Sequence, residues 1–196
     1  MGIPVTDDPY ALFADWWREA KESKRTYPDA MSLATADADG LPSVRIVLLK
    51  EWDDRGFVFY TNLTSAKSQD LQANPNAALC LYWESLGRQV RARGSVELVD
   101  DAQADAYFAS RPRDSQLGAW ASKQSQPLEG RFALEKRVAA YAAKYPIGAI
   151  PRPPFWSGWR IRPQQIEFWQ EGTFRLHDRV QYERDGDGWR HTALFP

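Results

Sequence analysis

The residues best suited to chemistry form a late run in which two arginines flank a histidine. Arg175, His177 and Arg179 occupy alternate positions of the chain. Alternate side chains of a β-strand share one face, so the run predicts two cations and a titratable imidazole side by side. Neighbouring like charges on a sheet are unfavourable unless an anion or a carboxylate lies between them. We therefore expect either a bound anion at this face or an ion pair with a carboxylate such as Glu167 or Glu183.

A second candidate is an apolar segment with a cation at each end. Arg45 and Lys50 enclose the four apolar residues Ile46, Val47, Leu48 and Leu49. Residues five apart on a strand point to opposite faces, so this strand could serve two ligands, one at each face or end. The alternative is that both cations are solvated charges at the ends of a strand.

The third candidate combines arginines with hydroxyl groups where a helix is expected to begin. Arg111 and Arg113 lie between Ser110 and Ser115. Free backbone N–H groups and the helix dipole favour an anion at such a place, and a phosphate is the natural ligand. The alternative is that Asp114 pairs with one of the arginines and caps the helix.

Composition disfavours several other functions. Two histidines and a single cysteine, Cys80, cannot assemble a Cys/His zinc site, and no metal site is expected. The sequence contains no glycine-rich phosphate loop, no G-x-S-x-G motif and no H-E-x-x-H motif. The formal net charge of −1 gives no basic field for nucleic acid. The start of the chain lacks an export signal and no segment approaches ~18 apolar residues, so a cytoplasmic protein without membrane contact is predicted.

The expected elements are mostly strands. An amphipathic helix is predicted over about residues 8–24, capped by Asp7 or Asp8, with Pro9 in its first turn. Strands are expected at 31–36, 43–50 and 57–61 as a meander, then at 77–83, 89–99, 157–161, 166–169 and 174–182. Further helices are expected at 65–73, 101–108, from 112 toward 120, and at 129–145, with an extended connector at 150–154.

These elements predict a mainly β protein with peripheral helices, in the α+β class. Strands and helices do not alternate regularly, which argues against a parallel βαβ sheet and favours a closed antiparallel barrel. One domain over residues 1–196 is expected, with the C-terminal strands, about 157–196, as part of it. Nine tryptophans suit packing in the core, and flat aromatic walls also suit a flat cofactor.

Taken together, the motifs resemble pyridoxine/pyridoxamine 5′-phosphate oxidases from about Asp8 to the C-terminus. The resemblance is carried by residues 45–50, 59–63, 110–116, 118–120, 122–125, 166–169 and 175–179, in the order that the family has them. It implies a Greek-key, FMN-binding split barrel that forms a homodimer with flavin mononucleotide (FMN) at the subunit interface.

The resemblance also implies roles for individual residues. The expected FMN contacts are Arg45, Ile46, Val47, Leu48, Leu49, Lys50, Tyr60, Thr61, Lys67, Gln89, Gln124, Ser125, Trp169 and Arg179. The expected substrate contacts are Lys50, Tyr107, Arg111, Ser115, Arg175, Leu176 and His177, of which Arg175 and His177 are the catalytic pair. Cations and hydroxyls in these sets suit phosphate groups, and amides suit the polar edge of a flavin.

The implied reaction is oxidation of pyridoxamine or pyridoxine 5′-phosphate to pyridoxal 5′-phosphate. Hydride would pass from C4′ of the substrate to flavin N5, and dioxygen would reoxidise the flavin to give hydrogen peroxide. Two features depart from the family. Ala66-Lys67 stands where a basic pair is common beside the FMN phosphate, and few residues precede Asp8, where many members carry an arm that closes over the substrate.

Two other functions compete with this interpretation. One is a related FMN oxidase with a different ring substrate, of the phenazine-pathway type, which would not need the phosphate-binding residues Lys50, Arg111 and Ser115. The other is a non-catalytic protein that binds flavin or pyridoxal phosphate, because a fold alone does not establish turnover. Retention of Arg175 and His177 argues against the second alternative.

Overall fold

The first helix, α1 (Pro9–Glu22), begins as its sequence predicts. The computed structural model describes residues 2–23 and 27–196. The Asp8 side chain accepts a hydrogen bond from the Tyr10 backbone N–H, and Pro9 follows the cap. The apolar side of α1 packs Phe13 and Trp16 against the sheet, where edge-to-face contacts join Trp16 to Phe168. The expected opening helix is therefore confirmed.

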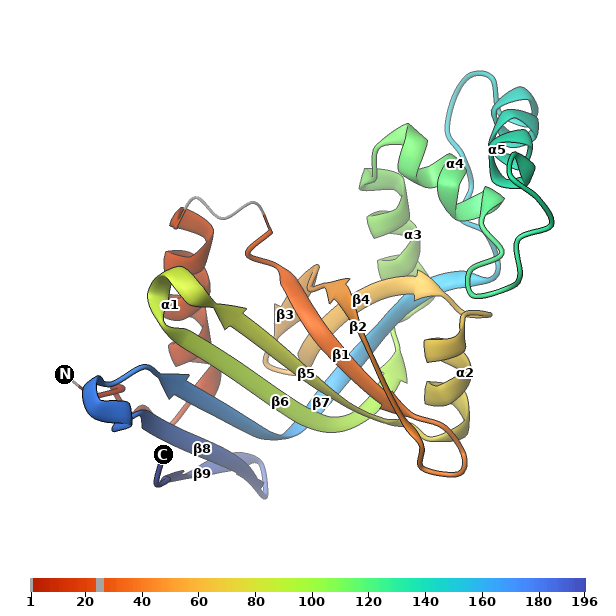
Figure 1. Cartoon of the computed structure of the whole chain (residues 1–196). Helices are drawn as coiled ribbons and strands as arrows, with labels where there is room; N and C mark the ends of the chain where they lie inside the picture. Colours follow the sequence, from red (N-terminus) through yellow and green to blue (C-terminus); the bar gives the residue numbers. More distant parts are fainter. Residues whose placement is uncertain (1, 24–26) are drawn as a thin grey trace.

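Among the described residues, nine antiparallel strands form one curled sheet (Figure 1). They are β1 (Ala30–Ala36), β2 (Pro42–Leu48), β3 (Glu51–Asp53), β4 (Gly56–Asn62), β5 (Asn76–Trp83), β6 (Arg88–Leu98), β7 (Trp156–Gln170), β8 (Asp178–Asp185) and β9 (Gly188–Ala193). The hydrogen-bonded order is β2-β1-β5-β6-β7-β4-β3, and β8 pairs with both β7 and β9. The mainly β, antiparallel class is as expected.

The expected meander and closed barrel are wrong. Strand β2 pairs with β1, whereas β4 lies between β3 and β7. The burial of the strands gives the reason, because β4 is buried almost throughout and needs a neighbour on each side, whereas β2 exposes Val44 and Ile46. Among the described residues, β2 and β3, the two ends of the pairing path, do not pair with each other. The sheet therefore curls without closing.

Strand β7 replaces two predicted strands. The segments 157–161 and 166–169 are parts of one strand of 15 residues. Its pairing with β6 passes from Gly94↔Pro163 to Arg93↔Gln165, so a bulge accommodates the proline without ending the strand. Gly94 is required there, because a Cβ atom would lie 2.0 Å from the Arg162 carbonyl oxygen. Strand β7 has β6 along one edge and β4, then β8, along the other.

The strand predicted over 174–182 begins only at Asp178. A turn of 3-10 helix, Thr173–Arg175, precedes it. Phe174 and Arg175 have φ angles of 56° and 63°, in the left-handed region that no β-strand residue occupies. Arg175 and His177 therefore do not alternate with Arg179 on one strand face, and the geometric basis of that expectation is wrong.

Four further helices occur in the part of the chain that the structure describes. They are α2 (Ala66–Ala73), α3 (Asp101–Ser110), α4 (Arg113–Ala121) and α5 (Ala133–Lys144), and a short turn, Glu84–Leu86, joins β5 to β6. Helix α5 begins four residues later than predicted. Helices α3, α4 and α5 lie together at one end of the sheet, away from α1 (Figure 1). A small cluster that contains Phe108, Leu117 and Trp156 fixes them to β7.

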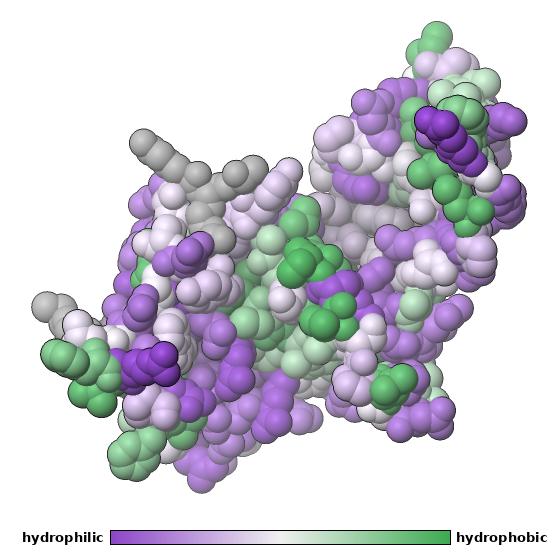
Figure 2. All heavy atoms as spheres, viewed as in Figure 1, coloured by the Kyte–Doolittle hydropathy of each residue, from purple (hydrophilic) through white to green (hydrophobic). Residues whose placement is uncertain are grey.

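The surface bears an apolar area over β2. Val44 and Ile46 are 69% and 64% exposed. Figure 2 shows hydrophobic side chains gathered in the middle of this face. Exposed apolar patches of this kind mark interaction surfaces. Within residues 2–23 and 27–196, no helix is long and apolar enough to cross a membrane.

Candidate active site

A cavity of about 720 Å³ opens between the sheet and helices α2, α3 and α4. Its lining contains most of the predicted binding residues, namely Arg45, Ile46, Val47, Leu48, Lys50, Tyr60, Thr61, Lys67, Tyr107, Arg111, Ser115, Gln124 and Ser125. We call these thirteen residues the cavity cluster. Leu49 is the exception in its segment, because its side chain is buried in the main core. The volume is within the usual range for a small-molecule site.

Arg45 and Lys50 serve the same cavity, contrary to the expectation of opposite faces. Strand β2 ends at Leu48, so strict alternation does not extend to Lys50. The Arg45 guanidinium donates to the Thr35 hydroxyl at 2.6 Å and lies 3.7 Å from the Asp70 carboxylate. Burial lowers the pKa of Arg45.

Lys67 is a buried cation whose hydrogen-bond partners carry no charge. Its side chain is 9% exposed. Its Nζ atom lies 3.2 Å from the hydroxyls of Thr61 and Ser65 and 3.1 Å from Oε1 of Gln124. Burial, and then the charge of Arg45, lowers the pKa of Lys67. A cation held by neutral groups beside a second cation gains from a bound anion.

A second cationic part of the cavity lies against a stack of aromatic rings. Tyr60 and Tyr107 stack with centroids 3.9 Å apart, and Trp156 continues the stack at 5.4 Å from Tyr60. The Arg111 guanidinium lies 4.7 Å from the centroid of Trp156, and its Nη1 atom is buried without a hydrogen-bond partner. An unpartnered buried donor in a cavity fits a ligand oxygen. Lys50 lines the same cavity and donates to Asp29 at 2.8 Å.

A carboxylate that no sequence motif predicted fixes this stack. Glu51 accepts a hydrogen bond from the Tyr60 hydroxyl at 2.7 Å and another from the Gln103 side chain. Burial, together with this hydrogen bond, raises the pKa of Tyr60. No motif indicated Glu51, because its role depends on two partners, Tyr60 in β4 and Gln103 in helix α3, that come together only in the fold. Trp156, also missed, was noted only for its aromatic type.

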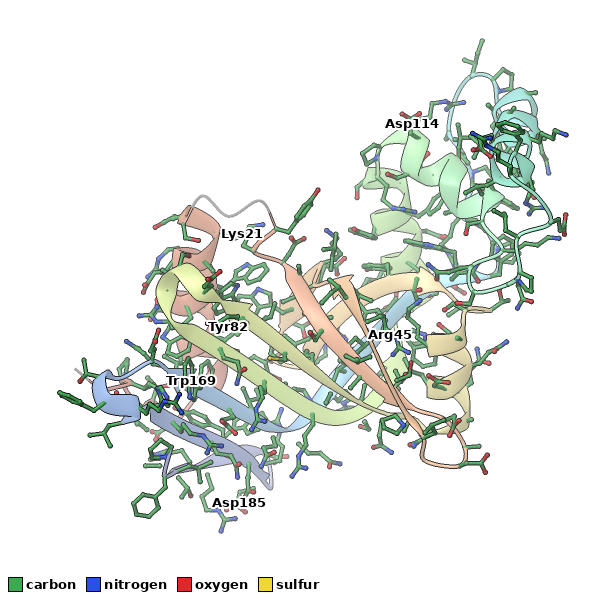
Figure 3. The ribbon with its side chains drawn as sticks, in the orientation of Figure 1. Lys21, Arg45, Tyr82, Asp114, Trp169 and Asp185 are labelled. Atoms are coloured by element: carbon green, nitrogen blue, oxygen red, sulfur yellow. The ribbon has the colours of Figure 1, made fainter. Side chains whose placement is uncertain are left out.

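The remaining predicted residues lie elsewhere and do not line this cavity. They are Gln89, Trp169, Arg175, Leu176, His177 and Arg179, which we call the β8 cluster. Gln89 is the cross-strand neighbour of Trp169, and Trp169 that of Arg179. The His177 ring lies 4.7 Å from the Trp169 ring. Figure 3 shows Trp169 and Arg45 well separated, at different parts of the sheet.

A buried carboxylate holds Arg179 in the β8 cluster. Glu167 is 4% exposed and accepts hydrogen bonds from Arg179 Nε at 3.0 Å and from Arg91. Arg179 also donates to the Phe195 carbonyl oxygen at 2.9 Å. Burial alone would raise the pKa of Glu167, but the two arginine hydrogen bonds outweigh it and lower that pKa. The expected ion pair between Glu167 and the run from Arg175 to Arg179 is confirmed for Arg179.

Replacing Glu167 with glutamine should lower stability at neutral pH and weaken the acid dependence of folding. We expect a loss of about 1–3 kcal/mol at pH 7 because two arginines lose their carboxylate. A lowered carboxylate pKa stabilises the folded state above the unfolded value of about 4.3, and this contribution disappears as the pH falls through the folded value. Urea unfolding at fixed protomer concentration measures the free energy of unfolding of both proteins. The difference between the variant and the wild type should become smaller below about pH 4.

A matched control for that variant is Glu183→Gln, whose partner Arg190 is exposed. Its effect should stay below about 0.5 kcal/mol. If Glu167→Gln lowered the free energy of unfolding by the same amount at neutral and at acid pH, the role assigned to the Glu167 charge would be contradicted.

No cluster of three or more His, Cys, Asp or Glu side chains that could hold a metal ion occurs in the described part of the chain. The polar groups in the cavity are instead cations, hydroxyls and amides, a set that suits phosphate oxygens.

The curled sheet and its cationic cavity place the chain in the FMN-binding split-barrel class. The crystal structure of PhzG from Burkholderia lata, in complex with tetrahydrophenazine-1-carboxylic acid, matches with a TM-score of 0.92 and 34% identity, over 97% of this chain and 94% of that one. A pyridoxamine 5′-phosphate oxidase-related, FMN-binding protein from Nostoc punctiforme shares the fold with a TM-score of 0.77 at 19% identity, over 98% of this chain and all of that one.

The family follows from the sequence comparisons. Residues 18–145 match the pyridoxamine 5′-phosphate oxidase model, and residues 156–196 match the pyridoxine 5′-phosphate oxidase C-terminal dimerisation region. Pyridoxine/pyridoxamine 5′-phosphate oxidases from Nitrobacter hamburgensis and Brucella canis are each 60% identical over 96% of this chain, and the matches cover 90% and 94% of those proteins. The chain belongs to the pyridoxamine 5′-phosphate oxidase family.

Proposed function

We propose that this protein is an FMN-dependent oxidase that converts pyridoxamine 5′-phosphate, pyridoxine 5′-phosphate or both to pyridoxal 5′-phosphate in the cytoplasm. The observation that carries the proposal is a single cavity with two sets of cations. Arg45 and Lys67 form one set, and Lys50 and Arg111 form the other. Two sets of cations suit two phosphate groups, one on the cofactor and one on the substrate. The names of the relatives with 60% identity agree with this chemistry.

The residues of the cavity fit FMN. When bound, FMN would supply the redox chemistry, a two-electron oxidation of the substrate at C4′ with dioxygen as the final acceptor and hydrogen peroxide as its product. Lys67 and Arg45 would hold the cofactor phosphate, with the hydroxyl of Thr61 as a further partner. The Gln124 amide, which already contacts Lys67, can turn one end toward the cofactor. Ser125, whose φ angle is 71°, lines the cavity beside it.

The substrate phosphate would bind at Lys50, Tyr107, Arg111 and Ser115, with the flat stack of aromatic rings as one wall. Arg175 and His177 would contact the pyridine ring and orient C4′. The protein thereby contributes position and charge, and the hydride transfer itself belongs to the cofactor. A ring substrate without a phosphate would leave Arg111 with no partner for its buried donor.

We further propose that each active site is shared between two chains, with FMN at the interface of a homodimer. The spacing along β7 supports this. Trp156 lies in the cavity stack and Trp169 in the β8 cluster, 13 residues apart on one strand and thus up to about 43 Å along it. The two clusters of one chain therefore lie toward opposite ends of β7, and Figure 3 shows Trp169 well separated from Arg45. A second chain related by two-fold symmetry could bring its β8 cluster to this cavity.

The experiment that tests the proposed activity is anaerobic mixing of the FMN-loaded protein with saturating pyridoxamine 5′-phosphate. The visible absorbance of the flavin should bleach and should recover, with formation of an aldehyde product, when air is admitted. Binding of both molecules without bleaching would reject the oxidase in favour of a binding protein. Bleaching by a phosphate-free ring substrate alone would instead favour the phenazine-type alternative.

Adding a cation at position 66 should tighten FMN binding. Ala66 is the first residue of α2, is exposed and lines the cavity beside Lys67. The variant Ala66→Arg should lower the FMN dissociation constant about fivefold, equivalent to roughly 1 kcal/mol, because a second arginine could reach the phosphate. Titration of the apoprotein followed by flavin fluorescence measures this. The control variant Ala73→Arg, at the other end of the same helix, should leave the FMN dissociation constant unchanged. If both variants had the same FMN dissociation constant, a cofactor phosphate at Lys67 would be contradicted.

A further inference from the structure

The backbone before β8 holds His177 in one orientation through one ring nitrogen. The Gly172 N–H donates a hydrogen bond to Nδ1 of His177 at 3.2 Å. The opposite ring nitrogen, Nε2, makes no hydrogen bond within residues 2–23 and 27–196. The half-buried ring lies against Trp169, with the two planes at 42°. One nitrogen is therefore occupied by the protein's own backbone and the other remains available.

This hydrogen bond fixes which nitrogen carries the proton. In a neutral imidazole one nitrogen donates and the other accepts. Nδ1 must accept, because the backbone N–H of Gly172 can only donate, so the hydrogen of the neutral ring resides on Nε2. Histidines that act as general bases usually donate Nδ1–H to a carboxylate, which orients them for proton transfer through Nε2. His177 has the opposite arrangement.

The turn that makes this contact tolerates little change. A Cβ atom at Gly172 would lie 2.0 Å from the Leu176 carbonyl oxygen, so only glycine fits. Phe174 and Arg175 both take the left-handed conformation, and the Leu176 N–H closes the turn onto the Thr173 carbonyl at 3.0 Å. Backbone strain of this kind persists only where the surrounding structure enforces it.

We propose that His177 acts as a hydrogen-bond donor through Nε2–H to an acceptor atom of the bound substrate, and that Gly172 is the positioning residue that sets this polarity. His177 would then orient the substrate and would not remove a proton from it. This inference deepens the proposed oxidase function and rests on it for the identity of the ligand. The protonation pattern itself does not depend on the reaction.

The first test measures the proton directly in the FMN-loaded protein. With ¹⁵N-labelled histidine at about pH 8, where an ordinary histidine is neutral, the two ring nitrogens give distinct signals according to which one carries hydrogen. We expect His177 to carry it on Nε2. The chain has only one other histidine, His191, which is exposed on β9, so the His191→Gln variant assigns the spectrum. Hydrogen on Nδ1 of His177 would overturn the proposal.

The second test compares two amides that each imitate one ring nitrogen. The variant His177→Gln places an N–H group near Nε2, whereas His177→Asn places its amide near Nδ1. We expect His177→Gln to keep kcat/KM within about fivefold of wild type and His177→Asn to lose about ten- to hundredfold. An asparagine variant as active as the glutamine variant would reject the donor role. Failure of the wild-type protein to bleach its flavin would reject the oxidase function, while the nitrogen spectrum would still decide the proton position.

Discussion

Two inactive variants, Arg111→Ala and Arg175→Ala, should restore activity when they are combined in one dimer. Arg111 lines the cavity and Arg175 belongs to the β8 cluster. If each cavity is completed by the partner's β8 cluster, a mixed dimer contains one site with both arginines intact. A purified heterodimer should then show about half the wild-type activity, and random mixing about a quarter. Two affinity tags and a steady-state assay for pyridoxal phosphate are sufficient to measure it.

The reciprocal pairing provides the control. A wild-type chain combined with the double variant Arg111→Ala/Arg175→Ala should be nearly inactive, because each of the two shared sites then lacks one arginine. If both clusters of one chain served the same site, the outcomes would be reversed, with activity in this dimer and none in the first. The two dimers contain the same substitutions, so differences in stability cannot produce that reversal.

Removing the Arg175 side chain should abolish most of the catalysis while FMN binding stays intact. We expect Arg175→Ala to lower kcat/KM by on the order of 10²-fold or more, because loss of an orienting cation misplaces the reacting carbon. The FMN dissociation constant should change by less than about threefold, since we propose that the cofactor phosphate binds in the cavity cluster, which does not contain Arg175. Single-turnover flavin reduction and FMN titration measure the two quantities separately. Equal losses in both would reject this division of roles.

The left-handed backbone at Arg175 allows a sharper version of this experiment. Alanine keeps the same strain as arginine at φ 63°, whereas glycine relieves it. If the side chain alone matters, Arg175→Ala and Arg175→Gly should lose activity equally. Arg190→Ala, which removes an exposed arginine paired with Glu183 on β8, should leave turnover unchanged.

Local features of the fold were predictable because each depends on neighbouring residues. Asp8 and Pro9 fix the start of α1, Asp100 caps α3, and turn residues separate the strands. Pairing order was not predictable in this way. The turn before β4 suggested a local meander, but β4 is buried and pairs with β7, about 100 residues later. Burial on both faces outweighs proximity in sequence, and a single sequence does not reveal which distant strand supplies the second neighbour.

The site residues were likewise predictable where they are close in sequence and not where they depend on distant contacts. Binding residues near one another in sequence, from Arg45 to Lys67, do converge on one cavity, although the strand ends before Lys50. The expected alternation does not hold at Arg175 because positive φ angles interrupt the predicted strand, and neither Phe174 nor Arg175 is a residue type that signals such a turn. Glu51 escaped notice because its partners come from β4 and α3.

The length of β7 has a consequence for engineering. One continuous strand connects Trp156, in the cavity, to Trp169, in the β8 cluster. The number of residues in β7 therefore sets the distance between these two groups of binding residues. Inserting or deleting one residue inside it would turn every side chain beyond that point to the opposite face of the sheet. Redesign of this scaffold can therefore replace side chains along β7 but cannot change their number. Extra residues belong in a segment such as that around Ile147, which is exposed and outside any helix or strand.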